Sequence, residues 1–131
     1  MTGQGTKRKI LVVDDEPDIA LTLKAGLEDI GLFSVETFSD SELALESFKP
    51  DIYALALIDI VMPKIDGFHL YESLKKIDPN VNVCFLTASE MYYGEARELE
   101  HCRLNKEIFL QKPISTDDLV REINKKISST R

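Results

Sequence analysis

Five residues that can take part in ionic or phosphoryl chemistry stand at the ends of short apolar runs. Asp14 and Asp15 come directly after the run 10–13, and Asp59 comes directly after the run 54–58. Thr87 ends a third apolar run, and Lys112 stands two residues after a fourth. Three carboxylates brought together repel one another, and either protonation of one acid or a bound divalent cation relieves the repulsion.

The donor atoms of this set favour Mg²⁺ and a phosphoryl group as ligands. Carboxylate oxygens without histidine or cysteine are hard ligands, and Mg²⁺ combines them with waters and phosphate oxygens. The Lys112 ammonium would offset the remaining charge, and the Thr87 hydroxyl would donate a hydrogen bond to the phosphoryl group. One carboxylate could then be the nucleophile and become an aspartyl phosphate.

Each residue also has an ordinary structural explanation when it is taken alone. The pair Asp14-Asp15 suits a helix N-terminus, where the macrodipole favours acids. Asp59 could be a solvated loop acid, Thr87 a strand end and Lys112 a surface cation. The recurrence of an apolar run that stops on a carboxylate favours the functional interpretation.

Alternating strands and helices are expected to position these residues. The short apolar runs are typical of strands buried on both faces. Helical spacing predicts helices that begin near Pro17, near Ser41 as an N-cap and near Phe68, a last helix capped by Thr116-Asp117-Asp118, and a less periodic helix over 89–103. Such alternation predicts an α/β sandwich with a mainly parallel sheet, whose ligands bind outside the carboxyl ends of the strands.

Composition and charge narrow the function classes. The 131 residues, 44% of them hydrophobic, suit one globular domain whose core needs no disulfide or structural metal. The net charge of −7 argues against direct nucleic-acid contact. Two cysteines, with no signal-peptide or membrane-spanning run, predict a cytoplasmic protein without membrane contact.

Five motifs together resemble the receiver domain of two-component response regulators. They are Val13-Asp14-Asp15-Glu16-Pro17, Leu57-Ile58-Asp59-Ile60-Val61-Met62-Pro63, Asp66-Gly67, Leu86-Thr87-Ala88 and Lys112-Pro113. The resemblance implies a flavodoxin-like (βα)5 sandwich, with a five-stranded parallel sheet of order 2-1-3-4-5 and helices on both faces. It also implies a flexible segment at 1–8, the receiver domain at 9–127, and a tail or linker stub at 128–131.

The resemblance assigns a role to each site residue. Asp59 would accept a phosphoryl group from a phosphohistidine of a sensor histidine kinase or phosphotransfer protein. Mg²⁺ would be held by Asp14, Asp15, the Asp59 side chain and the main-chain carbonyl of Val61.

The same resemblance implies phosphoryl contacts and a switch. Thr87, Ala88 and Lys112 would contact the phosphoryl group, and the Lys112-Pro113 bond would be cis. Phe109 would be the switch residue that turns inward when Thr87 moves. Partner binding would change as a result.

The expected partners beyond the phosphodonor are a downstream effector protein or domain and a second copy of the chain. A homodimer would use the face formed by the fourth helix, the last strand and the last helix. The segment 101–107 departs from the family pattern, so we expect a fourth helix that is short, mobile or reoriented. Because the receiver fills 9–127, output would pass to a separate protein, or the chain is part of a longer one.

Two other functions stay open from the sequence. One is a Mg²⁺-dependent phosphatase or phosphotransferase that works through an aspartyl phosphate, and the other is a docking domain independent of phosphorylation. The common phosphatases of that type need a second Asp two residues after the nucleophile, where this chain has Val61. We therefore expect no enzyme activity beyond the domain's own phosphorylation and dephosphorylation.

Val61 and Ser89 flank the expected path of an attacking water, and an apolar Val61 predicts slow hydrolysis of phospho-Asp59.

Overall fold

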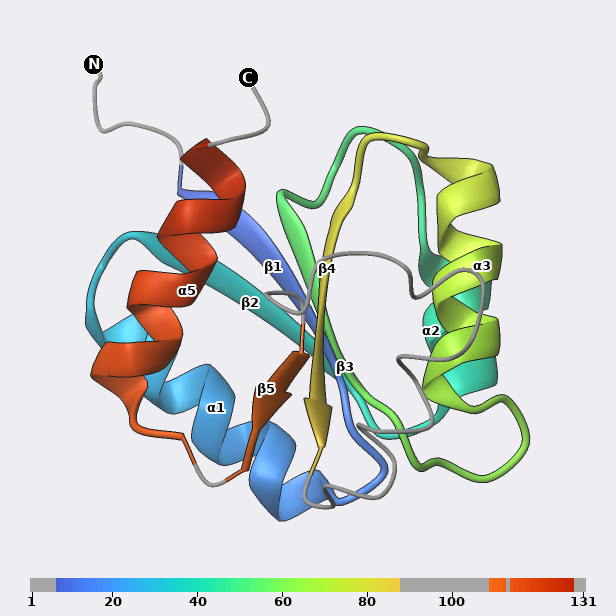
Figure 1. Ribbon diagram of the computed structural model, residues 1–131, viewed down its shortest axis with the longest axis horizontal. Coiled ribbons are helices and arrows are strands. Elements are labelled where there is room, and N and C mark those ends of the chain that lie inside the picture. The colour runs from blue at the N-terminus through green and yellow to red at the C-terminus, as the bar shows by residue number, and fades with distance from the viewer. Residues whose placement is uncertain (1–6, 88–108, 113, 129–131) are drawn as a thin grey trace.

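The computed structural model describes residues 7–87, 109–112 and 114–128, and strands and helices alternate along its residues 8–87 (Figure 1). The predictions for the helix at 89–103 and for Ala88, Ser89 and Pro113 lie outside these ranges. The elements are β1 (Arg8–Val13), α1 (Pro17–Asp29), β2 (Phe33–Phe38), α2 (Ser41–Ser47), β3 (Leu55–Asp59), α3 (Gly67–Ile77), β4 (Asn82–Thr87), β5 (Phe109–Gln111) and α5 (Thr116–Ser128).

The strands form one parallel sheet of order β2-β1-β3-β4-β5, which confirms the predicted fold. β1 lies between β2 and β3, so the chain reverses its direction of travel across the sheet after β2. In this topology the crevice at the carboxyl ends of β1 and β3 is the expected ligand site. Asp14 follows β1 directly, and Asp59 is the last residue of β3.

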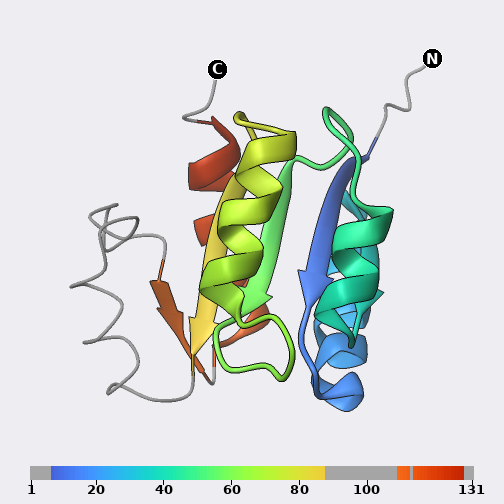
Figure 2. The ribbon, with the colours of Figure 1, turned by 90° about the vertical axis from the view of Figure 1, so that its right-hand side faces the viewer.

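Helices cover both faces of the sheet, with α1 and α5 on one face and α2 and α3 on the other (Figures 1 and 2). Alternate residues of β1 supply the two cores. Ile10 and Val12 pack in the cluster with α1 and α5, whereas Leu11 and Val13 pack in the cluster with α2. Burial on both faces is why this strand is a continuous apolar run.

The helix starts follow local capping chemistry, with differences from the sequence prediction at α2 and α5. At α5 the cap is Ser115 and not Thr116, because the Ser115 hydroxyl accepts a 3.1 Å hydrogen bond from the main-chain N–H of Asp118. Pro17 begins α1 as predicted, since proline suits the first helical position. The N-cap of α2 is Asp40, because its side chain accepts hydrogen bonds from the main-chain N–H groups of Glu42 and Leu43. The prediction that Ser41 is this cap is wrong, and the Ser41 hydroxyl contacts a different part of the fold.

Among the helices in the described ranges, none has the length and apolarity to cross a membrane.

Candidate functional site

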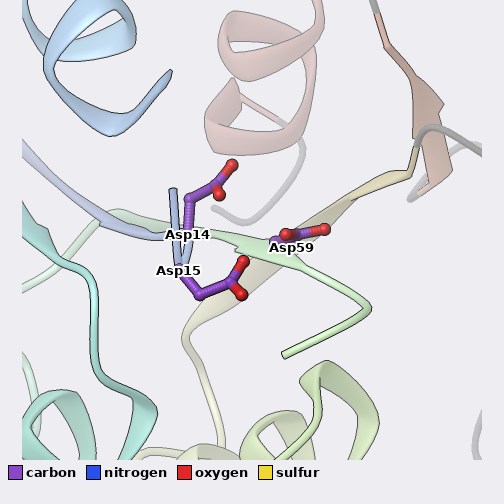
Figure 3. Close-up of side chains that lie close together, drawn as sticks. All are labelled: Asp14, Asp15 and Asp59. Atoms are coloured by element: carbon purple, nitrogen blue, oxygen red, sulfur yellow. The ribbon is translucent and has the colours of Figure 1, made fainter. Parts of the chain in front are cut away.

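The structure brings Asp14, Asp15 and Asp59 together at the carboxyl ends of β1 and β3 (Figure 3). One carboxylate oxygen from each residue lies within 4.8 Å of the other two. The register of β1 against β3 pairs Val13 with Ile58, so the residue that follows each of them emerges at the same level. The shared strand end therefore accounts for the cluster.

Two of these carboxylates are buried. Asp14 is 1% exposed and Asp59 is 8% exposed, while Asp15 is half-buried. The Asp14 Oδ1 atom accepts a hydrogen bond of 2.9 Å from the main-chain N–H of Glu16, which fixes the turn between β1 and α1. A buried carboxylate needs such partners because losing water disfavours its charged form.

Lys112, which directly follows β5 at the far edge of the sheet, brings one positive charge to the cluster. Its Nζ atom lies 3.0 Å from Asp14 Oδ2 and 3.8 Å from Asp59 Oδ1, and its side chain is only 16% exposed. Among the described residues, Lys112 thus pairs with two of the three carboxylates. The cluster keeps an excess of negative charge when all the acids are ionised.

Burial and the neighbouring charges together raise the pKa of Asp59 above that of an ordinary carboxyl group. The pKa of its carboxyl is raised to about 7: burial has the largest effect and the nearby Asp14 and Asp15 charges act in the same direction, while Lys112 and a main-chain hydrogen bond from Val61 lower it. Either a proton on Asp59 or a cation among the carboxylates would therefore relieve the repulsion between the negative charges. A set of hard oxygen donors with surplus negative charge fits Mg²⁺.

The loop between β3 and α3 carries Val61 two residues after Asp59. The Gly67 N–H donates a 2.9 Å hydrogen bond to the Ile60 carbonyl, which closes the loop at its base. A Cβ atom at Gly67 would lie 2.5 Å from the Asp59 main-chain oxygen, so no other residue fits without a shift of the backbone. The Asp66 carboxylate caps α3 by accepting from the His69 N–H.

Two more of the predicted residues, Thr87 and Phe109, lie on β4 and β5. Thr87 is the last residue of β4, the neighbour of β3, and pairs with Gln111 in the sheet register. Ala88 and Pro113 lie outside the described residues. Phe109 is 8% exposed and faces inward, with its ring stacked on that of Phe85 at a centroid distance of 5.3 Å. The movement of Phe109 as a switch stays a prediction.

Three residues near the cluster were not singled out for the site from sequence. The Ser41 hydroxyl is hydrogen-bonded to the residues on either side of Lys64, and Ser41 and Lys64 line a small pocket together with Asp15. Gly67 approaches the backbone of Asp59. The Asp66-Gly67 pair was a visible turn signal, but its contact with Asp59 depends on tertiary structure. Nothing in the local sequence around Ser41 or Lys64 indicates their contacts.

The comparisons with known proteins agree with this fold and arrangement. Residues 10–124 match the family model of the response regulator receiver domain. The chain belongs to the response regulator receiver domain family, and it is a receiver domain of the two-component type. Receiver domains work with histidine kinases and effector domains in signalling, and they generally bind Mg²⁺ at an acidic pocket.

The curated relatives are transcriptional regulators of greater length. A probable transcriptional regulator, ycf27, of Guillardia theta is 36% identical over 118 residues, which are 90% of this chain and 44% of that protein. The transcriptional regulatory protein DltR of Streptococcus agalactiae is 31% identical over 115 residues, or 88% of this chain and 50% of that protein. The chain spans about half the length of the curated relatives that it matches.

Solved structures show the same fold. A CheY-like response regulator receiver domain protein from Methanospirillum hungatei superposes with a TM-score of 0.81 at 26% identity, covering 95% of this chain and 97% of that one. A receiver domain protein from Clostridium thermocellum has a TM-score of 0.76 at 29% identity, covering 93% and 95%. The likeness thus extends over nearly the whole chain.

Proposed function

We propose that Asp59 accepts a phosphoryl group from a phosphohistidine on a sensor histidine kinase or phosphotransfer protein, and that this changes the binding of a downstream partner. The observation that carries the proposal is the cluster of Asp14, Asp15 and Asp59, two of them buried, with the Lys112 ammonium beside it. The cluster lies where ligands bind in this topology. The fold supplies the place, and the carboxylates supply both the nucleophile and the cation ligands.

The residues of the cluster divide between holding a cation and receiving the phosphoryl group. Asp14, Asp15, the Asp59 carboxylate and the Val61 main-chain carbonyl would hold Mg²⁺, because they form a set of hard oxygen donors. When bound, Mg²⁺ supplies positive charge shared between the carboxylate and phosphoryl oxygens. Asp14 also holds Lys112 through their 3.0 Å ion pair, which keeps the ammonium beside Asp59.

The transfer forms one bond and breaks another. An ionised Asp59 oxygen bonds to phosphorus while the phosphorus–nitrogen bond of the phosphohistidine breaks, and the bonding electron pair stays with the imidazole nitrogen, which takes up a proton. Lys112 Nζ, 3.8 Å from Asp59 Oδ1, is close enough to pair with a phosphoryl oxygen carried on Asp59. Because the Asp59 carboxylate and the phosphoryl oxygens are both negatively charged, a fixed cation next to them lowers the energy barrier to the transfer.

The proposal extends to the residues that would report the modification. Thr87 and Ala88 would contact the phosphoryl group from the end of β4, and Phe109 on β5 would change its packing when Thr87 moves, with the Lys112-Pro113 bond in the cis form. The position of Thr87 beside the end of β3 supports this assignment. The output would be an altered contact with an effector protein or domain, or with a second copy through β5 and α5 and the segment between β4 and β5. The domain would catalyse only its own phosphorylation and dephosphorylation.

Intact mass after incubation with acetyl phosphate tests the proposal. The wild-type protein should gain the mass of one phosphoryl group only when Mg²⁺ is present, and Asp59→Ala should gain none. Asp29→Ala, which removes an exposed acid at the end of α1, is the matched control and should behave as the wild type. A gain that survives Asp59→Ala, or no gain in the wild type, would overturn the assignment.

A further inference from the structure

The loop that follows Asp59 is held at its middle by the start of α2. The Ser41 hydroxyl accepts a 3.3 Å hydrogen bond from the Ile65 N–H and donates one of 3.4 Å to the Pro63 carbonyl. Ser41 is 3% exposed, so its hydroxyl has little access to solvent as an alternative partner. A single buried hydroxyl therefore bridges the two residues on either side of Lys64.

Lys64 makes a second connection between the same two segments. Its Nζ atom lies 2.9 Å from Asp40 Oδ2, while the other oxygen of Asp40 caps α2. The backbone of Lys64 has φ of +67°, a left-handed conformation that is unfavourable for a residue with a Cβ atom. The contacts from Ser41 and Asp40 offset that cost and hold the turn in one conformation.

The connection between β2 and α2 also contacts the turn that carries Asp14 and Asp15. The Asp14 N–H donates a 3.1 Å hydrogen bond to the carbonyl of Phe38, at the end of β2. A small pocket is lined by Asp15, by the segment 39–41 and by the loop residues 62–64. The segment 38–41 therefore touches both the Asp14-Asp15 turn and the loop that carries Val61.

We propose that Ser41 is a positioning residue for the cation site, because it sets where the Val61 carbonyl lies relative to Asp14 and Asp15. Val61 lies between two fixed points, the end of β3 at Asp59 and the Ser41 contact at Pro63. Mg²⁺ requires close to octahedral geometry with short bonds, so a small shift of a main-chain ligand reduces affinity. The inference rests on the proposed function and adds a residue to it.

The Mg²⁺ affinity of charge-neutral variants tests this inference without any phosphodonor. Ser41→Ala removes the bridging hydroxyl, and we expect its Kd for Mg²⁺ to rise about tenfold, the lower end of the range for residues that orient metal ligands. Ser41→Cys keeps the shape of the side chain with a slightly larger and only weakly hydrogen-bonding group, and it should show a smaller rise in the same direction. The matched control is Asn82→Ala, which removes a 3.1 Å hydrogen bond to the Ala54 carbonyl at the opposite end of the sheet.

Amide resonances followed by NMR during a Mg²⁺ titration give these constants. Asn82→Ala should stay within about twofold of the wild type, and in the metal-free protein the Ile65 amide should exchange faster in Ser41→Ala than in Asn82→Ala. If Ser41→Ala binds Mg²⁺ as tightly as Asn82→Ala, the positioning role is overturned while the proposed function stands. A wild-type protein that binds no Mg²⁺ would overturn both.

Discussion

The ammonium of Lys112 lies 3.0 Å from the carboxylate of Asp14, although the two residues are 98 positions apart in the chain. Lys112 follows β5 at one edge of the sheet, and Asp14 follows β1 beyond β3 and β4. Their contact needs every strand between them in register. The charge balance at Asp59 is therefore a property of the complete sheet rather than of any local motif.

Replacing Lys112 should change cation binding and phosphorylation in opposite directions. Lys112→Met removes a positive charge that opposes Mg²⁺, and a unit charge at about 4 Å is worth about 1 kcal/mol even at the dielectric constant of water. We expect the affinity for Mg²⁺ to rise about fivefold, while phosphorylation by acetyl phosphate slows because the phosphoryl oxygens lose their ammonium partner. Metal titration and a time course of intact mass check the two effects. If Lys112→Met lowered both the affinity for Mg²⁺ and the rate of phosphorylation, Lys112 would be needed for the folded structure and the charge argument would be contradicted.

The stability of the metal-free protein should depend on the ionisation of Asp59. Its pKa is about 7 in the folded protein against an ordinary value of 3.8, so the folded state holds the proton more tightly than the unfolded state. Stability from this group is present below about pH 4, falls as the pH rises towards 7, and is lost above it. Asp59→Asn, which cannot ionise, should therefore stabilise the protein by up to about 4 kcal/mol at pH 8 and by much less at pH 5.

Urea unfolding in the presence of EDTA measures this difference. Added Mg²⁺ should reduce the advantage of Asp59→Asn at pH 8, because the cation favours the ionised carboxylate. Asp29→Asn, at an exposed acid, is the control. An advantage of Asp59→Asn that is equal at pH 5 and pH 8 would contradict a raised pKa as its cause.

The side chain of Val61 should make phospho-Asp59 long-lived. Val61 is 49% exposed beside the loop and has no polar atom with which to orient an attacking water. We expect slow loss of the phosphoryl group, and faster loss in Val61→Asn, whose amide can hydrogen-bond water. Intact mass at intervals after removal of the donor gives the lifetime. A wild-type lifetime of only seconds would be incompatible with this expectation.

Phe109 should contribute strongly to stability through its aromatic neighbours. Its ring stacks on Phe85 and lies edge-on to Phe68 at a centroid distance of 6.4 Å. Phe109→Ala removes a buried aromatic side chain, so we expect a loss of about 3 kcal/mol in the free energy of unfolding. Phe109→Leu should lose less because it refills part of the space. A loss below about 1 kcal/mol for the alanine variant would mean that the ring is not packed as described.

The sheet and the acidic cluster could be predicted from sequence because strong local signals agree with topology. Apolar runs such as 10–13 and 54–58 are read as strands buried on both faces; the first lies in β1, and all but the first residue of the second lies in β3. The residue after each run then lies at the carboxyl edge, where parallel strands end together. This argument needs no knowledge of side-chain packing, which is why Asp14 and Asp59 could be assigned to one place.

The contacts of Ser41 could not be predicted in the same way. A serine at the start of a helical run is a sound N-cap by local rules, yet Asp40 one residue earlier takes that role. The Ser41 hydroxyl then meets Pro63 and Ile65, more than twenty residues further along the chain. The left-handed backbone at position 64 is likewise set by tertiary contacts, since the residue there is a lysine and not the glycine or asparagine that usually signals this conformation.

The central claim is that the Asp59 carboxylate receives the phosphoryl group, and locating that group on the chain tests it most directly. Reduction of the acyl phosphate with borohydride after treatment with acetyl phosphate and Mg²⁺, followed by peptide mass mapping, marks the modified side chain. We predict a single modified residue, Asp59, and no mark when Mg²⁺ is left out. A mark on Asp14 or Asp15, or one that persists in Asp59→Ala, would contradict the account.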